Sequence, residues 1–245
     1  MPRVARIVAE GVPHHVTQRG NNRQDVFFVD DDRRVYLELL AGQAERFGLD
    51  VHAYCLMTNH MHLIVTPRRA DSLAKALGRA HWRYTQYINR LHGRGGHLWQ
   101  NRFFSCPLDA AGAWTGMRYV ERNPVRSHLV RQAWRYEWSS AGCHCGVAAP
   151  PEWLEMALWR DVAGGSDWQE ALTAAEDEAE IAPLRRCTHT GRPLGSDSFL
   201  ARLETLLGRR VRALPVGRPT GKPDKAKERR HRRSDSKNAG EKRHK

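Results

Sequence analysis

Two histidines separated by a single residue begin an apolar run at residues 59–65, which read Asn-His-Met-His-Leu-Ile-Val. Side chains two residues apart on a strand point to the same face of a sheet. His60 and His62 therefore share one face, while the residues that alternate with them face a core. Residues 49–57 alternate as well, and Thr58-Asn59 can form a tight connection between the two segments. The sequence predicts a β-hairpin that presents a pair of imidazoles.

The elements on either side of this hairpin predict the fold class. They are, in chain order, a strand at 14–18, helices at 30–47 and 72–91, a strand at 99–108 and a helix at 110–122. The last helix stops before Pro124, because a residue that precedes proline avoids the helical conformation. This order is typical of α+β proteins with one antiparallel sheet and helices packed mainly on one face.

Composition divides the chain into three predicted parts. Residues 1–145 form the first domain, which holds the strands and helices above, and residues 146–215 form a helical extension with helices near 152–181 and 196–208. Residues 216–245 contain almost no apolar side chains and are rich in Lys, Arg, Pro and Gly. Such a segment cannot bury a core, so we predict a disordered basic tail.

The chain is strongly basic, with 40 Lys and Arg against 27 Asp and Glu, a formal net charge of +13. Residues 222–245 hold eleven of the basic and four of the acidic residues, which leaves a net +6 for the preceding part. A basic tail alone is weak evidence of a partner, but a body that stays basic without its tail favours nucleic acid.

Other compartments and cofactors find little support in the sequence. No run of about 18 apolar residues predicts a membrane span, and the N-terminus lacks the apolar stretch of a signal peptide. The five cysteines have no paired zinc spacing, and Cys143-His144-Cys145 is tighter than usual zinc sites. We expect a cytoplasmic protein.

The candidate chemistry is cleavage of a phosphodiester bond by a tyrosine. Tyr119 and Asn123 are one helical turn apart and share a face of their predicted helix. If that face lies over the hairpin, Asn123 can join His60 and His62 around one ion, and the Tyr119 oxygen can approach the phosphorus. Imidazoles with an amide oxygen suit Mg²⁺ or Mn²⁺. Each motif alone also has an ordinary structural explanation, as a polar sheet face or a helix surface.

Several segments together resemble one known family. They are residues 14–23 (HHVTQRGNNR), 59–65, 99–103 (WQNRF) and 119–126 (YVERNPVR). These motifs are similar in order and spacing to those of the REP-associated tyrosine transposases, single-tyrosine members of the HUH superfamily. The resemblance covers about residues 1–145, and it implies the ferredoxin- or RRM-like fold of that superfamily.

The resemblance also implies roles for individual residues. His60 and His62 would be the metal ligands, and Tyr119 the nucleophile that forms a 5′-phosphotyrosine link. Asn123 stands where related enzymes carry a third, amide-bearing ligand, although the wider superfamily has the longer Gln there. The implied substrate is single-stranded DNA beside a hairpin of a repetitive palindrome.

Further residues have two open interpretations. Arg19, Arg23 and Arg102 either contact DNA phosphates or are ordinary solvated charges. Arg218, in Gly-Arg-Pro, either enters a DNA minor groove or belongs to a plain linker. Tyr84, with Tyr87, is similar to the tyrosine pair of replication initiators and relaxases, but packing is the simpler role.

Three functions therefore compete. The first is a metal-dependent, single-tyrosine nickase and strand transferase, and the second a rolling-circle replication initiator or relaxase. The third is a non-catalytic DNA-binding protein, against which His60, His62 and Tyr119 argue. A homodimer, in which the tyrosine helix serves the partner's histidines, is also compatible with the sequence.

Overall fold

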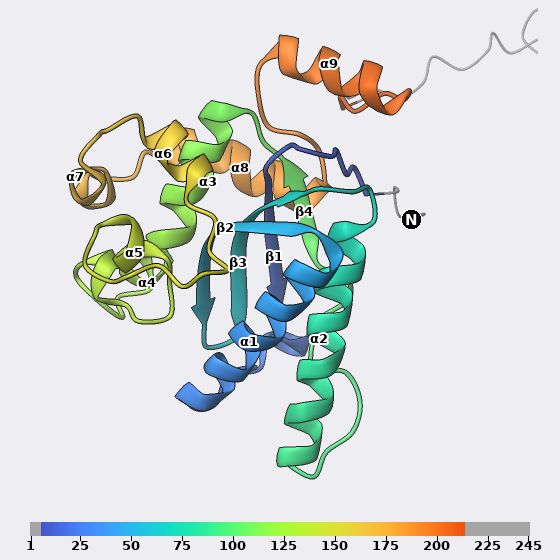
Figure 1. Cartoon of the computed structure of the whole chain (residues 1–245), viewed down its shortest axis with the longest axis vertical. Coiled ribbons are helices and arrows are strands. Elements are labelled where there is room, and N and C mark those ends of the chain that lie inside the picture. Colours follow the sequence, from blue (N-terminus) through green and yellow to red (C-terminus); the bar gives the residue numbers. More distant parts are fainter. Residues whose placement is uncertain (1–5, 214–245) are drawn as a thin grey trace, which may run out of the picture. The chain divides into compact units, whose positions relative to one another are not determined.

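A four-stranded antiparallel sheet with the strand order β2-β3-β1-β4 lies at the centre of the fold (Figure 1). The computed structural model describes residues 6–213, so the predicted tail and Arg218 lie outside the described residues. The strands are β1 (His14–Arg19), β2 (Leu49–Met57), β3 (His60–Pro67) and β4 (Phe104–Pro107). The predicted α+β class and the β2–β3 hairpin are both confirmed.

Nine α-helices surround this sheet in the described part of the chain. They are α1 (Asp30–Phe47), α2 (Ser72–Leu91), α3 (Ala110–Glu121), α4 (Asn123–Arg126), α5 (Ala141–His144), α6 (Ala157–Ala163), α7 (Trp168–Thr173), α8 (Glu178–Thr190) and α9 (Asp197–Leu207). Two 3₁₀ turns, η1 (Asn21–Arg23) and η2 (Ala133–Arg135), complete the described elements. None of the helices within residues 6–213 combines the length and apolarity needed to cross a bilayer.

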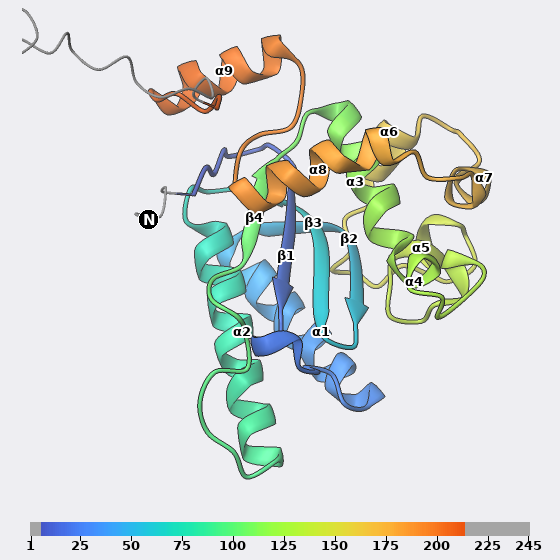
Figure 2. The ribbon, with the colours of Figure 1, turned by 180° about the vertical axis from the view of Figure 1, so that it is seen from behind.

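Both faces of the sheet are covered by helices. The long helices α1 and α2 lie on one face, and α3 and α8 lie over the other (Figures 1 and 2). The sequence predicted helices mainly on one face, so the second layer is an addition. It forms because β3 is buried on both sides: Leu63 packs toward α1 and α2, and Ile64 packs toward α3. We call these two regions the α2-side core and the α3-side core.

A β-bulge places β2 between the two cores. Strict alternation predicts Val51 and Ala53 on the same side of the strand. The pairing with β3 shifts register between these two residues, and Val51 packs in the α2-side core while Ala53 packs in the α3-side core. An extra residue in one strand reverses the facing of every later residue. The bulge therefore brings Cys55 beside His62 on the α3 side.

Local side-chain bonds fix where the helices begin. The Asp109 side chain accepts a hydrogen bond from the backbone nitrogen of Gly112, so it caps α3 as its position predicts. At α1 the capping side chain is that of Asp32, whose carboxylate accepts hydrogen bonds from the backbone nitrogens of Phe28 and Val29. These caps satisfy backbone donors that have no partner within the helix.

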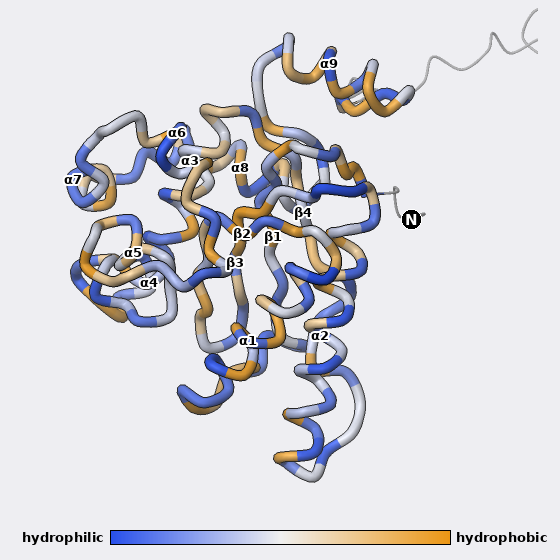
Figure 3. The backbone as a smooth tube through the Cα atoms, viewed as in Figure 1, coloured by the Kyte–Doolittle hydropathy of each residue, from blue (hydrophilic) through white to orange (hydrophobic). Residues whose placement is uncertain are grey.

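Two predicted elements are shorter than expected. The strand predicted over 99–108 pairs continuously only in β4, and Trp99 contributes a single bridge to Gly20. The helix predicted over 152–181 is divided into α6, α7 and the start of α8. Gly164 and Gly165 both have positive φ, at 58° and 76°, and end α6. The helix predicted over 196–208 is α9, along which hydrophobic and hydrophilic residues alternate (Figure 3).

The predicted boundary at residue 145 does not separate two compact units. Helix α8, from the extension, packs on β4 and α3, and residues through Arg212 form one unit. Leu172 and Leu184 of the extension lie in the α3-side core. The extension therefore builds the side of the sheet that carries His60 and His62.

Candidate active site

His60 and His62 lie side by side at the start of β3. Their ring centroids are 5.1 Å apart, and their planes are nearly perpendicular. His62 is buried and His60 is half-buried, while the intervening Met61 points into the α2-side core. The predicted alternation is thus confirmed. Both imidazoles are close enough to approach one ion together.

Hydrogen bonds hold one nitrogen of each ring. His60 Nδ1 lies 2.7 Å from Asn59 Oδ1, and His62 Nδ1 lies 3.0 Å from the Nε2 atom of His15. These contacts leave the Nε2 atom of both rings for a ligand. Metal-binding histidines commonly have this arrangement, with one nitrogen held by a neighbour and the other bound to the ion.

Burial keeps both imidazoles neutral at physiological pH. Desolvation, together with the nearby guanidinium groups of Arg19 and Arg126, lowers the pKa of His60 to about 4. Desolvation, followed by the charge of His15, holds the pKa of His62 well below its ordinary value. A neutral imidazole is the form that binds a metal.

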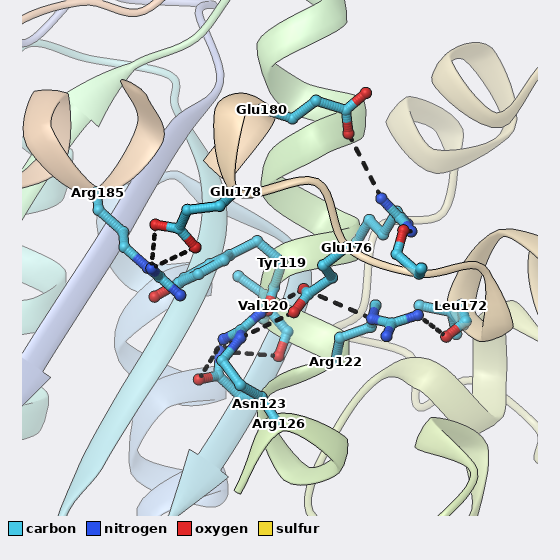
Figure 4. Close-up of polar contacts among 12 residues, drawn as sticks. Tyr119, Val120, Arg122, Asn123, Arg126, Leu172, Glu176, Glu178, Glu180 and Arg185 are labelled. Carbon is cyan, nitrogen blue, oxygen red and sulfur yellow. Dashed lines mark hydrogen bonds and ion pairs between the residues drawn. The ribbon is translucent and has the colours of Figure 1, made fainter. Parts of the chain in front are cut away.

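Helix α3 brings Tyr119 to these histidines. The centroid of its half-buried ring lies 5.5 Å from that of His62 and 5.7 Å from that of His15, edge-on in both cases. Two guanidinium groups lie against the ring, Arg126 at 4.3 Å from its centroid and Arg185 at 5.6 Å. Figure 4 shows Arg185 beside the Tyr119 side chain, held by Glu178 at 2.7 Å. The predicted nucleophile and the histidine pair therefore meet.

Buried polar contacts fix the orientation of α3. The fully buried Glu121 carboxylate accepts a hydrogen bond from Trp168 Nε1 at 2.7 Å and lies 2.6 Å from His144 Nδ1. On the same helix, Arg118 donates to the carbonyl oxygens of Ala171 and Ala174 at 2.7 and 2.8 Å. All of these partners belong to α5, α7 or the loop that follows α7. These bonds to α5, α7 and the following loop hold α3, and with it Tyr119, in place.

The Asn123 side chain is hydrogen-bonded to the end of α3 and to Arg126. Its side-chain nitrogen donates to the carbonyl oxygens of Tyr119 and Val120 at 3.0 and 3.3 Å, and its oxygen accepts from Arg126 at 3.2 Å (Figure 4). Arg126 is in turn paired with Glu176. The amide oxygen predicted as the third ligand thus accepts a hydrogen bond from Arg126 with one of its two lone pairs.

The predicted DNA-binding arginines divide between two clefts. A cleft of about 420 Å³ beside Tyr119 is lined by Arg19, Arg23 and Arg185. Arg102 lines a neighbouring cleft of about 620 Å³ between α2 and residues 97–103. All four guanidinium groups belong to exposed residues. The two clefts share Asn101 in their walls.

The alternative tyrosines lie in the α2-side core. Tyr84 is fully buried and donates its hydroxyl to the Val26 carbonyl oxygen at 2.6 Å, and Tyr87 donates to Asp32 at 3.3 Å. Packing is therefore the role of Tyr84, as expected. Trp82, on the same helix, does not pack in this core: its side chain is 55% exposed and lines the 620 Å³ cleft.

Sequence reasoning missed three residues of the site: His15, Thr188 and Arg185. His15 alternates with Thr17 on β1 and so faces the same side as His62, a signal that was available. Thr188 and Arg185 lie on α8, more than sixty residues after Tyr119, and no local pattern connects them to it. In the Cys143-His144-Cys145 segment, His144 Nδ1 lies 2.6 Å from a Glu121 carboxylate oxygen, and residues 6–213 contain no cluster of three His, Cys, Asp or Glu ligands.

Comparisons with known proteins agree with the resemblance of the motifs. The family model of IS200-like transposases matches residues 9–123. A solved REP-associated tyrosine transposase bound to a REP hairpin superposes with a TM-score of 0.53 and 16% identity, over 64% of this chain and 93% of that chain. A protein from Deinococcus radiodurans described as a candidate transposase shares 21% identity over 53% of this chain and 92% of that chain, with a TM-score of 0.35. No curated protein matches the chain.

The matched region holds the hairpin, the histidine pair and Tyr119. The sheet and its helices have the fold of the REP-associated tyrosine transposase structure. Motifs, family model and fold thus agree with one another, and residues 9–123 are similar to the IS200-like transposases.

Proposed function

We propose that this protein nicks and rejoins single-stranded DNA beside a palindromic hairpin, through a 5′-phosphotyrosine intermediate on Tyr119. The observation that carries the proposal is the convergence of His60, His62 and Tyr119 on one face of the sheet. Tyr119 comes from a helix almost sixty residues later in the chain, so this meeting is a product of the fold. The solved relative bound to a REP hairpin supports the choice of substrate.

A divalent ion, Mg²⁺ or Mn²⁺, fits the histidine pair. His60 and His62 are neutral and each has its Nδ1 atom held by a neighbour, so the two Nε2 atoms can bind one ion. Asn123 could add its oxygen through the lone pair that the hydrogen bond from Arg126 leaves free. When bound, the ion would polarise a phosphate oxygen and offset developing negative charge.

The chemistry of the chain's own residues is a transesterification. The Tyr119 hydroxyl oxygen forms a bond to phosphorus while the bond from phosphorus to the 3′ oxygen breaks. The phenol gives up its proton to solvent, and the departing 3′ oxygen takes one up. Arg126 and Arg185 lie against the Tyr119 ring, where their positive charge can offset the negative charge that develops at the phosphate during the attack. Attack by a second 3′ hydroxyl on the phosphotyrosine reverses the step and rejoins the strand.

The two clefts provide surfaces for an unpaired strand. Arg19 and Arg23 beside Tyr119 can hold phosphates next to the reacting one. In the neighbouring cleft Trp82 offers an exposed ring beside Arg102 and Arg6, and unpaired bases stack on such rings. Because the clefts share Asn101, one strand can follow both.

A cleavage assay on labelled hairpin oligonucleotides with randomised single-stranded flanks tests the proposal. With Mn²⁺ the wild-type protein should yield a shortened product and a protein–DNA adduct. Tyr119→Phe should yield neither, while Tyr84→Phe, which removes a hydroxyl from the α2-side core, should keep both. Binding of the oligonucleotides without any product from the wild-type protein would favour a non-catalytic DNA-binding protein.

A further inference from the structure

A third imidazole, His15, lies behind the histidine pair. It is buried on β1, and its ring is parallel to that of His62, at 3° between planes. The rings meet through their nitrogens, with His15 Nε2 3.0 Å from His62 Nδ1. On its other side, His15 Nδ1 lies 2.7 Å from the Thr188 hydroxyl of α8. His15 thus connects a proposed metal ligand to the extension.

The direction of the protons in this chain of contacts can be derived. The Thr188 hydroxyl donates to the Leu184 carbonyl oxygen at 2.8 Å, so toward His15 it acts as the acceptor. His15 therefore carries its proton on Nδ1. A neutral imidazole has only one N–H group, so the unprotonated Nε2 atom of His15 accepts a hydrogen bond from the N–H group at His62 Nδ1. His62 is left with an unprotonated Nε2, the form that binds a cation.

We propose that Thr188 and His15 form a hydrogen-bond relay that holds His62 in its metal-binding tautomer and orientation. The proposal rests on the assignment of His62 as a ligand in the proposed function. Both members are positioning residues, since each acts through His62. The relay contains neutral groups, so it orients the ligand without adding a negative charge next to an incoming phosphate.

The relay gives the C-terminal extension a part in the site. Thr188 lies on α8, beyond the residues 9–123 that match the family model. Arg185, three residues earlier on the same helix, lies against Tyr119. One helix thus reaches both the proposed ligand and the proposed nucleophile. The Thr188 hydroxyl oxygen also lies 3.3 Å from the Cys106 sulfur. Its second lone pair can accept a weak hydrogen bond from this thiol.

Two variants remove the relay with little change of shape. Thr188→Val removes the hydroxyl, and His15→Phe keeps a flat ring without nitrogens. Thr190→Val is the matched control, because this exposed threonine of α8 bonds only to carbonyl oxygens of its own helix. Thermal unfolding of each protein checks that it is folded.

The primary measurement is the dissociation constant of Mn²⁺ without DNA, from electron paramagnetic resonance of the free ion. Loss of an outer partner of a ligating histidine weakens metal binding by about 10- to 100-fold. We expect that loss for His15→Phe, a smaller loss for Thr188→Val, and no change for Thr190→Val. Wild-type affinity in both relay variants would overturn the proposal.

A second measurement separates the relay from the proposed function. Nitrogen-15 spectra of the imidazoles report the tautomer without any metal, and they should show His62 protonated on Nδ1 in the wild-type protein. Protonation on Nε2 would overturn the relay. If His60→Ala and His62→Ala leave Mn²⁺ binding unchanged, the metal assignment fails instead, whatever the tautomer is.

Discussion

The two sides of the sheet each carry a cluster of histidine and tyrosine rings, but the clusters use their polar atoms differently. In the α2-side core, the Tyr36 hydroxyl lies 3.0 Å from His81 Nε2 and the Tyr84 hydroxyl donates to Val26. Burial raises the pKa of both tyrosines far above its ordinary value. These polar groups are paired with one another or with the backbone, and the rings act as packing.

On the α3 side the rings are equally close, but some of their nitrogen atoms have no hydrogen-bond partner among the described residues. His60 and His62 use only their Nδ1 atoms, and Tyr119 is half-buried beside a cleft. The comparison shows that a cluster of histidine and tyrosine is not by itself a site. What distinguishes the α3 side is a pair of adjacent histidines whose Nε2 atoms are both left without a hydrogen bond within residues 6–213, next to a half-buried tyrosine.

The largest effect expected from this difference is on cleavage. His60→Ala or His62→Ala should lower the rate of hairpin cleavage about 10³-fold or more, because several kcal/mol of charge stabilisation at the phosphate are lost. Affinity for DNA should change only a few fold, since phosphate contacts by Lys and Arg dominate binding. Single-turnover cleavage with Mn²⁺ and a filter-binding assay measure the two quantities.

His52→Gln is the matched control for those variants. His52 is another buried histidine of the sheet. It is hydrogen-bonded to Thr66 and to the Glu155 carbonyl oxygen, neither of which belongs to the candidate site. Its replacement should leave cleavage intact. If His60→Ala, His62→Ala and His52→Gln lost activity equally, the cause would be general damage to the sheet. The loss would then give no evidence of a specific role for His60 and His62.

A smaller effect is expected at the cleft beside the α2-side core. Trp82→Ala should weaken binding of the single-stranded part of the substrate about tenfold, because stacking of one base is worth about 1–3 kcal/mol. Leu91→Ala removes another exposed apolar side chain of α2 and should have no effect. Fluorescence anisotropy with hairpins that have or lack a single-stranded flank tests this. Wild-type affinity of Trp82→Ala for the flanked hairpin, or an equal loss of affinity for both hairpins, would contradict the prediction.

The smallest effect concerns stability at low pH. Burial lowers the pKa of His81 to about 3, against about 6.5 in an unfolded chain. Between these values the unfolded state binds the additional proton, so the free energy of unfolding falls as the pH falls. The loss from His81 is up to about 1.4 kcal/mol per pH unit.

His81→Gln removes this titration while keeping a partner for the Tyr36 hydroxyl. Urea unfolding between pH 7 and pH 4.5 should therefore show a shallower pH dependence for the variant than for the wild-type protein. The two proteins should differ least in slope above pH 7, where His81 is neutral in both states. Parallel curves over the whole range would show that His81 can be protonated within the fold.

Much of this comparison could be predicted from the sequence, because it depends on local pattern. The alternation of His60 and His62 with apolar residues follows from the geometry of a strand, and the Asp109 cap marks the start of α3. The approach of Tyr119 to the histidines could be predicted only with the family resemblance. Two segments almost sixty residues apart carry no local signal of their contact.

Other features required the folded chain. The side-chain oxygen of Asn123 is bound by Arg126, a choice between hydrogen-bond partners that spacing cannot reveal. Thr188 reaches His15 across 173 residues, and it does so because α8 packs on β4. The bulge after Val51 changes which face of β2 meets His62. Each depends on tertiary packing, which overrides the local pattern.

Mapping the covalent protein–DNA adduct tests the central claim most directly. The wild-type protein would be incubated with hairpin oligonucleotides and Mn²⁺, digested with protease and nuclease, and sequenced by mass spectrometry. Because Tyr119 is the tyrosine beside the histidine pair, the nucleotide should be attached to Tyr119 through a 5′ phosphate. Attachment to Tyr84 or Tyr87 would contradict the account and would favour a replication initiator or relaxase.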